Sequence, residues 1–381
     1  MENLLNKNDS IELNNSIKKI NINQGLEMIN IEPGHLYLYL NMIGGHSFFV
    51  VYKDKYLIKS VGQKELKFYE FIKTNNIESR HIPKFYGLIE KNTKQYEYII
   101  DYKRKCDIFF KNMVKMFDIK MQDIDIENEI IFHKKFEDFI NDKNNLNNVE
   151  DYCHNNLFLD KSFDILKEEL IKIKNKCPKK LFWIFYWYIK WQKEFISDKY
   201  IIIENLEYHI KKPSIIDIKL GNEKKISKET GKVKVFKGVY ESLGCRIMGI
   251  SSNNIYFKSR YETKELTEKE FINELIYFFS DRKNIIVSVI NELKEIIKFV
   301  QNNFCLKIYF CSLLIFYDNS ENDNEAIVKL IDFDLTNNTK DYNCELCLIN
   351  KENNDIIKSH ANDGFINCMN NLINIIISIN K

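Results

Sequence analysis

The sequence predicts an α+β fold with two lobes: a small lobe built on an antiparallel sheet and a larger lobe that follows a hinge. Residues 36–51 show the pattern strand, glycine turn, strand, which is typical of a hairpin. An apolar run at 199–203 leads directly into the polar tripeptide 204–206, as expected where a strand ends at a hinge. Apolar residues then recur at helical spacing in 268–279 and 285–300, which predicts two amphipathic helices in the larger lobe.

The overall charge of the chain is nearly balanced. Lys and Arg number 56 and Asp and Glu number 54 among 381 residues, so the chain lacks the broad basic field of a nucleic-acid-binding protein. We expect no nucleic-acid partner, and any site for a polyanion must be a local patch. No run approaches the roughly 20 apolar residues of a membrane span, so no stable membrane insertion is expected. Nine cysteines without an amino-terminal apolar signal segment predict an intracellular, reducing location, in the cytoplasm, the nucleus or both.

Two cysteines, Cys344 and Cys347, form a C-x-x-C pair. A structural zinc site needs four ligands, and His360 is the only nearby further candidate. We therefore expect ordinary thiols here, with zinc as the alternative.

All three tryptophans of the chain, Trp183, Trp187 and Trp191, are four residues apart within an apolar run at 181–191. On a helix this spacing places them along one face. Such a stripe is typical of a buried core, and the alternatives are a membrane-surface helix or a partner-binding face. A further helical stretch is expected at 165–173.

The run Pro-Ser-Ile-Ile-Asp-Ile-Lys-Leu-Gly at 213–221 predicts a strand bounded by proline and glycine. Because side chains two apart share a face of a strand, Asp217 and Lys219 should stand side by side at the mouth of a sheet. Gly221 lets the chain turn where a β-carbon would crowd a ligand. An isolated Asp-x-Lys is more often a solvent-exposed salt bridge, so the pair alone leaves both interpretations open.

The strand expected at 56–59 ends in Lys59, and a helical pattern begins at Glu65. A strand lysine followed by a helix glutamate is the arrangement with which kinases hold the phosphates of a nucleotide. Taken alone, Lys59 fits a solvated strand end better.

Lysines are concentrated directly after Gly221. Residues 222–240 carry six lysines against two glutamates, a net charge of +4 in a nearly neutral protein. A charge run is usually a solvated face, but next to Asp217 and Lys219 it becomes a candidate for binding phosphates. The six are Lys224, Lys225, Lys228, Lys232, Lys234 and Lys237.

A second strand with acidic residues is expected at 330–336. Alternation places Asp332 and Asp334 on one face of this strand and the apolar side chains on the other. Two carboxylates on one face beside a nucleotide form a hard-oxygen site suited to Mg²⁺.

In their order along the chain, these segments resemble the sequence blocks of the inositol polyphosphate kinases. The most specific is Pro-x-x-x-Asp-x-Lys-x-Gly at 213–221. Gly-Gly-His at 44–46, Ile-Pro-Lys-Phe-Tyr-Gly at 82–87, Leu-Gly-x-Arg-Ile-x-Gly at 243–249 and Ile-Asp-Phe at 331–333 are similar to further blocks. The resemblance covers about two thirds of the chain, and its specificity lies in the ordered combination.

The resemblance implies a two-lobed fold distantly similar to that of protein kinases, with ATP and Mg²⁺ as cofactors. It implies that Lys59 contacts the ATP phosphates, that Glu204 and Leu206 contact the adenine, and that Asp217 binds the ribose hydroxyls. Asp332 matches the family's metal ligand.

Lys219 is expected, by the same resemblance, to meet both the transferring phosphate and the substrate, which makes Lys219 and Asp332 the expected catalytic residues. Among the lysines after Gly221, the expected substrate ligands besides Lys219 are Lys224, Lys225 and Lys228.

The chain is expected to divide into a tail, two lobes and an insertion. Residues 1–30 are rich in Asn and Lys with isoleucines at irregular spacing, which predicts a disordered tail. The small lobe and hinge are expected at 31–206 and the larger lobe, with the catalytic and substrate-binding motifs, at 207–381. After an expected strand at 96–100 the family pattern is lost, so about 102–198 is treated as a variable insertion.

The function implied by the resemblance is transfer of the ATP γ-phosphate to an inositol polyphosphate. The hinge Glu204-Asn205-Leu206 is most similar to that of the inositol hexakisphosphate kinases, which implies a diphosphoinositol product. Two departures are Lys264, where the family has arginine, and Asp334-Leu335, where it has Ala-His. The alternatives are a multikinase or trisphosphate 3-kinase acting on less phosphorylated inositols, and a non-catalytic inositol-phosphate-binding scaffold.

Overall fold

The computed structural model describes residues 29–43, 49–77, 79–116, 161–191, 197–221, 225–226, 233–234, 239–252, 255–280, 282–302, 306–308, 310–320, 325–334, 337–338 and 363–380. Of the expected tail, only residues 29 and 30 are among them. Several residues considered above lie outside the described ranges, namely 44–46, Lys224, Lys228, Cys344, Cys347 and His360.

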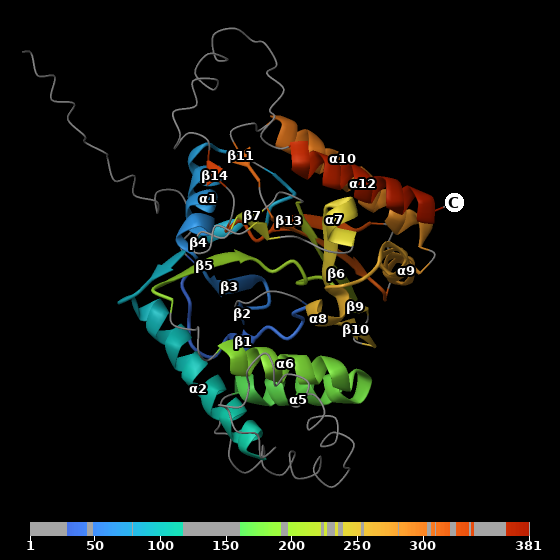
Figure 1. Cartoon of the computed structure of the whole chain (residues 1–381). Helices are drawn as coiled ribbons and strands as arrows, with labels where there is room; N and C mark the ends of the chain where they lie inside the picture. The colour runs from blue at the N-terminus through green and yellow to red at the C-terminus, as the bar shows by residue number, and fades with distance from the viewer. Residues whose placement is uncertain are drawn as a thin grey trace, which may run out of the picture.

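The first sheet is antiparallel and has five strands in the order β1-β2-β3-β5-β4 (Figure 1). β2 and β3 are joined by a tight turn in which Lys53 and Asp54 have φ angles of 49° and 56°. The strands are β1 Leu36–Leu38, β2 Phe49–Tyr52, β3 Tyr56–Ser60, β4 Phe85–Glu90 and β5 Lys199–Glu204.

Three helices from the region of the expected insertion pack against the first sheet (Figure 1). They are α2 Lys94–Met116, α5 Lys161–Lys176 and α6 Pro178–Trp191. Trp183 and Trp187 are each 3% exposed in the shared apolar cluster, which confirms the core interpretation for these two residues. The side chain of Trp191 is not among those described.

Residues 96–100 are helical, so the strand expected there was wrong. They belong to α2, and the hydroxyl of Thr93 accepts a hydrogen bond from the backbone N–H of Tyr96 at 3.2 Å at the start of this helix. Apolar burial at helical spacing along α2 outweighs the strand preference of tyrosine and isoleucine. The buried positions are Tyr96, Ile99, Tyr102, Cys106, Phe109 and Phe110.

The second sheet is also antiparallel, with the order β10-β9-β6-β12-β13. Its strands are β6 Pro213–Leu220, β9 Cys245–Ser252, β10 Tyr256–Lys258, β12 Ser312–Asp318 and β13 Ile327–Ile331. β6 lies in the middle, paired with β9 on one side and β12 on the other.

Three long helices share the core of the second sheet (Figure 1). They are α9 Glu268–Phe279, α10 Lys283–Asn302 and α12 Asp363–Ile379, and the first two confirm the helices predicted at 268–279 and 285–300. The short elements are α7 Val239–Leu243, α8 Arg260–Thr263, β7 Lys225–Ile226, β8 Val233–Lys234, β11 Leu306–Lys307 and β14 Asn337–Asn338.

One buried apolar cluster joins the two lobes. It runs from Val51 and Leu57 of the first sheet through α1 Gln63–Thr74 into the second sheet and its helices. The fold is therefore α+β with two lobes and a small antiparallel sheet at the amino-terminal end, as predicted. Within the described segments, no helix combines the length and the apolar character needed to cross a bilayer.

Candidate active site

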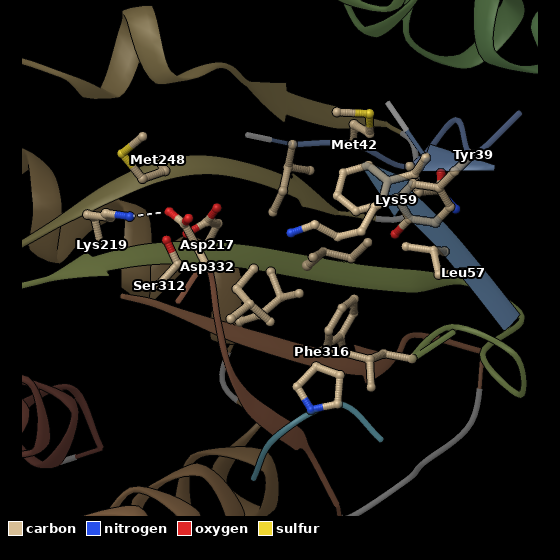
Figure 2. A pocket seen from close by; sticks show the side chains of 18 of the residues that line it. Tyr39, Met42, Leu57, Lys59, Asp217, Lys219, Met248, Ser312, Phe316 and Asp332 are labelled. Carbon is tan, nitrogen blue, oxygen red and sulfur yellow. Dashed lines mark hydrogen bonds and ion pairs between the residues drawn. The ribbon is translucent and has the colours of Figure 1, made fainter. Parts of the chain in front are cut away.

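A cavity of about 660 Å³ is lined by residues of both sheets. Figure 2 shows Lys59 reaching into it from the first sheet, while Asp217 and Lys219 face it from the second. An apolar wall with a few placed polar groups is what a nucleotide base requires. The apolar part of the wall includes Leu57, Ile203, Ile215, Leu314 and Phe316.

Lys59 and Glu65 form a buried ion pair in this cavity. The Lys59 Nζ lies 2.8 Å from Oε2 and 2.9 Å from Oε1 of Glu65, and the two side chains are 11% and 3% exposed. Glu65 is in the first turn of α1, so a strand lysine and a helix glutamate do meet. Burial lowers the pKa of Lys59, but the charge and hydrogen bond of Glu65 and the charges of Asp332 and Asp334 together outweigh it, so the net change is upward. Burial raises the pKa of Glu65. The ammonium is therefore held, charged, at the cavity wall.

Asp217 and Lys219 both line the cavity from β6, which confirms that they share a face. The ion pair, however, is between Lys219 Nζ and Asp332 Oδ2 (Figure 2), whereas the Asp217 carboxylate is hydrogen bonded with Ser312. Burial raises the pKa of Asp217 to about 6, although Lys219 and Ser312 act in the opposite direction.

Asp217 also carries an unused acceptor. The residue is 7% exposed, and among the described residues its Oδ1 has no hydrogen-bond partner. Buried polar atoms are nearly always satisfied, so an orphaned carboxylate oxygen at a cavity wall fits a hydroxyl group brought by a ligand.

Asp332 and Asp334 lie in a loop after β13, not in the strand expected at 330–336. The strand ends at Ile331, and Asp332 has a φ of 64°. Aspartate is one of the few non-glycine residues that adopt this left-handed conformation readily. Both carboxylates line the cavity, so the prediction that they face the site is right, but the turn at Asp332 and not strand alternation places them there.

Asp334 lies at the amino-terminal end of α1. A β-carbon added at Gly62, the residue before this helix, would fall 2.8 Å from Asp334 Oδ1. Gly62 supplies no capping side chain, and a carboxylate beside a helix N-terminus interacts favourably with the helix dipole. The acidic loop therefore contacts the helix that carries Glu65.

The hinge residue Glu204 ties the two lobes together. Its Oε2 accepts hydrogen bonds from Lys329 Nζ of β13 and from the backbone N–H of Lys84, both at 3.3 Å. Residues 204–206, including the predicted adenine contacts Glu204 and Leu206, border the cavity. Their roles toward adenine remain predictions.

Three cations that the sequence did not single out as site residues line the cavity: Arg246, Arg260 and Lys264. Arg246 lies across from Lys219 in the sheet register, and its guanidinium carbon is 5.1 Å from the centroid of the Tyr240 ring. Burial lowers the pKa of Arg246, and the neighbouring Arg260 acts in the same direction. Arg246 and Lys264 were noticed only as members of sequence blocks, while Arg260 lies in the short helix α8 and carried no signal.

The lysines predicted to bind the substrate are only partly described. Lys225 lies in β7, which pairs with β8, and the structure describes its backbone. Lys224 and Lys228 fall outside the described ranges, so the substrate roles of all three remain predictions.

The carboxylates of Asp332 and Asp334 fit a divalent cation that comes with a nucleotide. In the described part of the chain, no group of three or more His, Cys, Asp or Glu side chains forms a complete protein ligand set. Mg²⁺ is commonly bound by one or two carboxylates, with substrate phosphates and water completing its six ligands.

A cavity between two lobes, a strand lysine paired with a helix glutamate, and an acidic loop opposite them are the parts of a kinase-type site. Comparisons with known proteins agree. Residues 200–377 match the family described as Inositol polyphosphate kinase. This match, which is carried by residues 200–377, supports an assignment to the inositol polyphosphate kinase family.

The relatives include two subtypes. The chain is 23% identical over 137 residues to inositol polyphosphate multikinase of Homo sapiens, which covers 32% of this chain and 33% of that protein. It is 22% identical over 154 residues to inositol hexakisphosphate kinase 1 of Rattus norvegicus, with 36% and 35% covered. The matches thus span about a third of the length of these relatives. A crystal structure of the inositol phosphate multikinase Ipk2 from S. cerevisiae, in complex with ADP and Mn²⁺, is 18% identical and matches 48% of this chain and 84% of that chain, with a TM-score of 0.35.

Proposed function

We propose that the protein is an ATP- and Mg²⁺-dependent kinase that phosphorylates an inositol polyphosphate. The observation that supports this most directly is the composition of one cavity. Lys59, paired with Glu65, enters from the small lobe, and Asp217, Lys219 and Asp332 enter from the large lobe. Phosphoryl transfer depends mainly on positioning and on neutralising charge, and fixed cations with carboxylates for a metal supply both.

The nucleotide is proposed to lie along the apolar wall. Glu204 and Leu206 would border its adenine, and Lys59 would contact its phosphates. The orphaned Oδ1 of Asp217 would accept a hydrogen bond from a ribose hydroxyl.

Lys219 is proposed to neutralise charge on the transferring phosphoryl group and to contact the acceptor. Asp332 would hold Mg²⁺, which when bound neutralises charge on the phosphate oxygens. The ion pair of Lys219 with Asp332 places the two catalytic candidates next to each other.

The proposed substrate is inositol hexakisphosphate, with a diphosphoinositol as product. Arg246, Arg260 and Lys264 line the cavity together with Lys219, and the lysine-rich run follows β6 directly. A substrate with more phosphates is better matched by many dispersed cations, whereas choosing one hydroxyl among several needs directional contacts. The relatives include both multikinases and hexakisphosphate kinases at similar identity, so they favour neither subtype.

The experiment that tests this proposal is a parallel assay. Purified protein and Mg-ATP would be incubated with inositol hexakisphosphate or inositol trisphosphate, and the products separated by charge, with Asp332→Asn as the control for activity at this site. A more highly charged product from hexakisphosphate is expected. Efficient use of trisphosphate alone would make the protein a multikinase or 3-kinase, and no product from either would favour the scaffold alternative.

The proposed boundaries are those of the sequence: a tail at 1–30, a small lobe with the hinge at 31–206, an insertion at about 102–198 and a larger lobe at 207–381. The first sheet falls entirely within 31–206 and the second within 207–381, which supports the division.

A further inference from the structure

A side chain from helix α6 reaches the wall of the cavity. Lys180 of α6 is 0% exposed, and its Nζ donates a hydrogen bond to Asn41 Oδ1 at 2.7 Å. Asn41 Nδ2 donates to Glu207 Oε2 at 2.5 Å, and the hydroxyl of Tyr39 donates to Glu207 Oε1. Tyr39 and Asn41 line the cavity, and Glu207 directly follows the hinge residue Leu206.

The segment that carries Tyr39 and Asn41 continues onto the large lobe. A β-carbon added at Gly249 of β9 would fall 1.7 Å from the carbonyl oxygen of Ile43, so the backbone of Ile43 lies directly on this strand. Gly249 is opposite Asp217 in the sheet register. Residues 39–43 are thus held to Glu207 at one end and rest beside a nucleotide-site strand at the other.

Helix α6 also packs on the part of the large lobe that lines the cavity. Trp183 stacks on Tyr261 of α8, with ring centroids 5.1 Å and ring planes 11° apart, and Lys179 forms an ion pair with Glu262. α8 begins with Arg260, one of the cavity cations. α6 therefore contacts segments from both lobes that line the cavity.

We propose that the α5–α6 pair supports the wall of the nucleotide cavity from behind, and that Lys180 is a positioning residue that holds Asn41 and Glu207 in the geometry needed to bind a nucleoside triphosphate. The inference rests on the proposed function and assigns a role to the insertion, which the sequence did not. Lys180 acts through Asn41 and Glu207, so its loss is expected to change nucleotide affinity and the KM for ATP more than kcat.

The charge of Lys180 makes this role dependent on pH. Burial lowers the pKa of Lys180 to about 8, although Glu207 from the turn after the hinge, Cys177 and Glu169 of α5 raise it. Burial raises the pKa of Tyr39 and of Cys177, which keeps both neutral between pH 7 and 9. In that range Lys180 loses its charge, and nucleotide affinity is expected to fall with it.

The test is direct binding of a non-hydrolysable ATP analogue with Mg²⁺ by calorimetry, at pH values from 7 to 9. Lys180→Met is expected to weaken binding about tenfold at pH 7, the effect of losing one charged hydrogen bond. Lys180→Arg retains a permanent cation, and binding by this variant should vary less between pH 7 and 9 than binding by the wild type. Lys176→Met is the matched control, because Lys176 is an exposed lysine at the end of α5; it should bind as the wild type does.

If Lys180→Met fails to fold, the double variant Lys180→Met/Glu207→Gln distinguishes an effect on folding from an effect on nucleotide binding. This variant removes both charges and keeps an amide that can accept from Tyr39, and it should fold yet still bind the analogue weakly. Wild-type affinity in either folded variant, with an unchanged pH profile, would overturn the positioning role alone. No binding by the wild type would overturn the proposed function, and the role of Lys180 with it.

Discussion

Phe333 and Phe68 lie face to face, with ring centroids 3.8 Å apart and ring planes 16° apart. Phe333 is the apolar residue between the two carboxylates of the acidic loop, and Phe68 is on α1. The same ring of Phe333 meets Tyr69 edge to face at 5.9 Å. The loop proposed to hold the metal is therefore packed onto the helix whose Glu65 holds Lys59, so ring packing connects the two sides of the site.

A double-mutant cycle on this stack is expected to show coupling. Phe333→Leu and Phe68→Leu should each lower the free energy of unfolding by about 1.5 kcal/mol. The loss in the double variant should be about 1 kcal/mol smaller than the sum of the two single losses, because the stacking interaction can be lost only once. Denaturant unfolding measures these values. Strict additivity would show that the rings contribute only by separate burial.

Binding of Mg-ATP is expected to depend on Asp332. A saturating ligand at a hundred times its Kd stabilises the folded state by about 2.7 kcal/mol, which is read as a rise in Tm. Asp332→Asn keeps a residue that tolerates a φ of 64°, so it should fold normally but show a smaller rise with Mg-ATP. Measurements without Mg²⁺ provide the control, and equal rises in both proteins would contradict the metal assignment.

Lys219→Ala is expected to reduce turnover far more than nucleotide affinity. In the proposed role the ammonium neutralises charge that develops as the phosphoryl group transfers, and removing one such group costs on the order of a hundredfold in kcat. Steady-state kinetics with varied ATP separates the two effects. Unchanged kcat with a raised KM would assign Lys219 to ground-state binding.

Asp217→Asn is expected to stabilise the protein at neutral pH while it abolishes turnover. Burial raises the folded-state pKa of Asp217 from 3.8 to about 6, so the ionised carboxylate costs stability above pH 6. A shift of this size corresponds to at most about 3 kcal/mol. The cost is relieved as the pH falls through 6 and is gone below 3.8.

Thermal unfolding of both proteins from pH 4 to 8 measures this effect. The Asn variant should be the more stable at pH 8, and the difference should vanish near pH 4. A variant that is less stable at every pH would mean that the carboxylate stabilises the fold, contrary to this prediction.

Breaking the Lys59–Glu65 pair one residue at a time is expected to be costly. Lys59→Met leaves the Glu65 carboxylate buried and unpaired, which should lower the free energy of unfolding by about 3 kcal/mol or more. The double variant Lys59→Met/Glu65→Leu should recover much of that stability but should not bind ATP. Comparable stability in the single and double variants would show that Glu65 finds another partner.

The parts of the site that the sequence predicted are those decided by local spacing. Asp217 and Lys219 share a face because they are two apart on a strand, and Lys59 meets Glu65 because a short connection joins a strand to a helix. Both relations follow from the geometry of a single element or of two adjacent ones.

The parts that the sequence missed depend on backbone conformation or on contacts between distant segments. The left-handed conformation of Asp332 ends the strand at Ile331, although the sequence alternates as a strand would beyond it. Residues 96–100 are helical because their apolar side chains are buried at helical spacing. Lys180 and Asn41 are 139 positions apart, and Asn41 and Glu207 are 166 apart. No periodicity within one segment can predict such a contact.

Gly249 has a consequence for how the lobes can move. Where Ile43 crosses β9, the contact is between main chains, because no side chain projects from position 249. Where packed surfaces shear past one another, interlocked side chains must change rotamer. Position 249 has no side chain, so no rotamer change is needed there. A shear about 204–206 would therefore find no side chain to repack at position 249, and an alanine at that position would act as a steric wedge between the lobes.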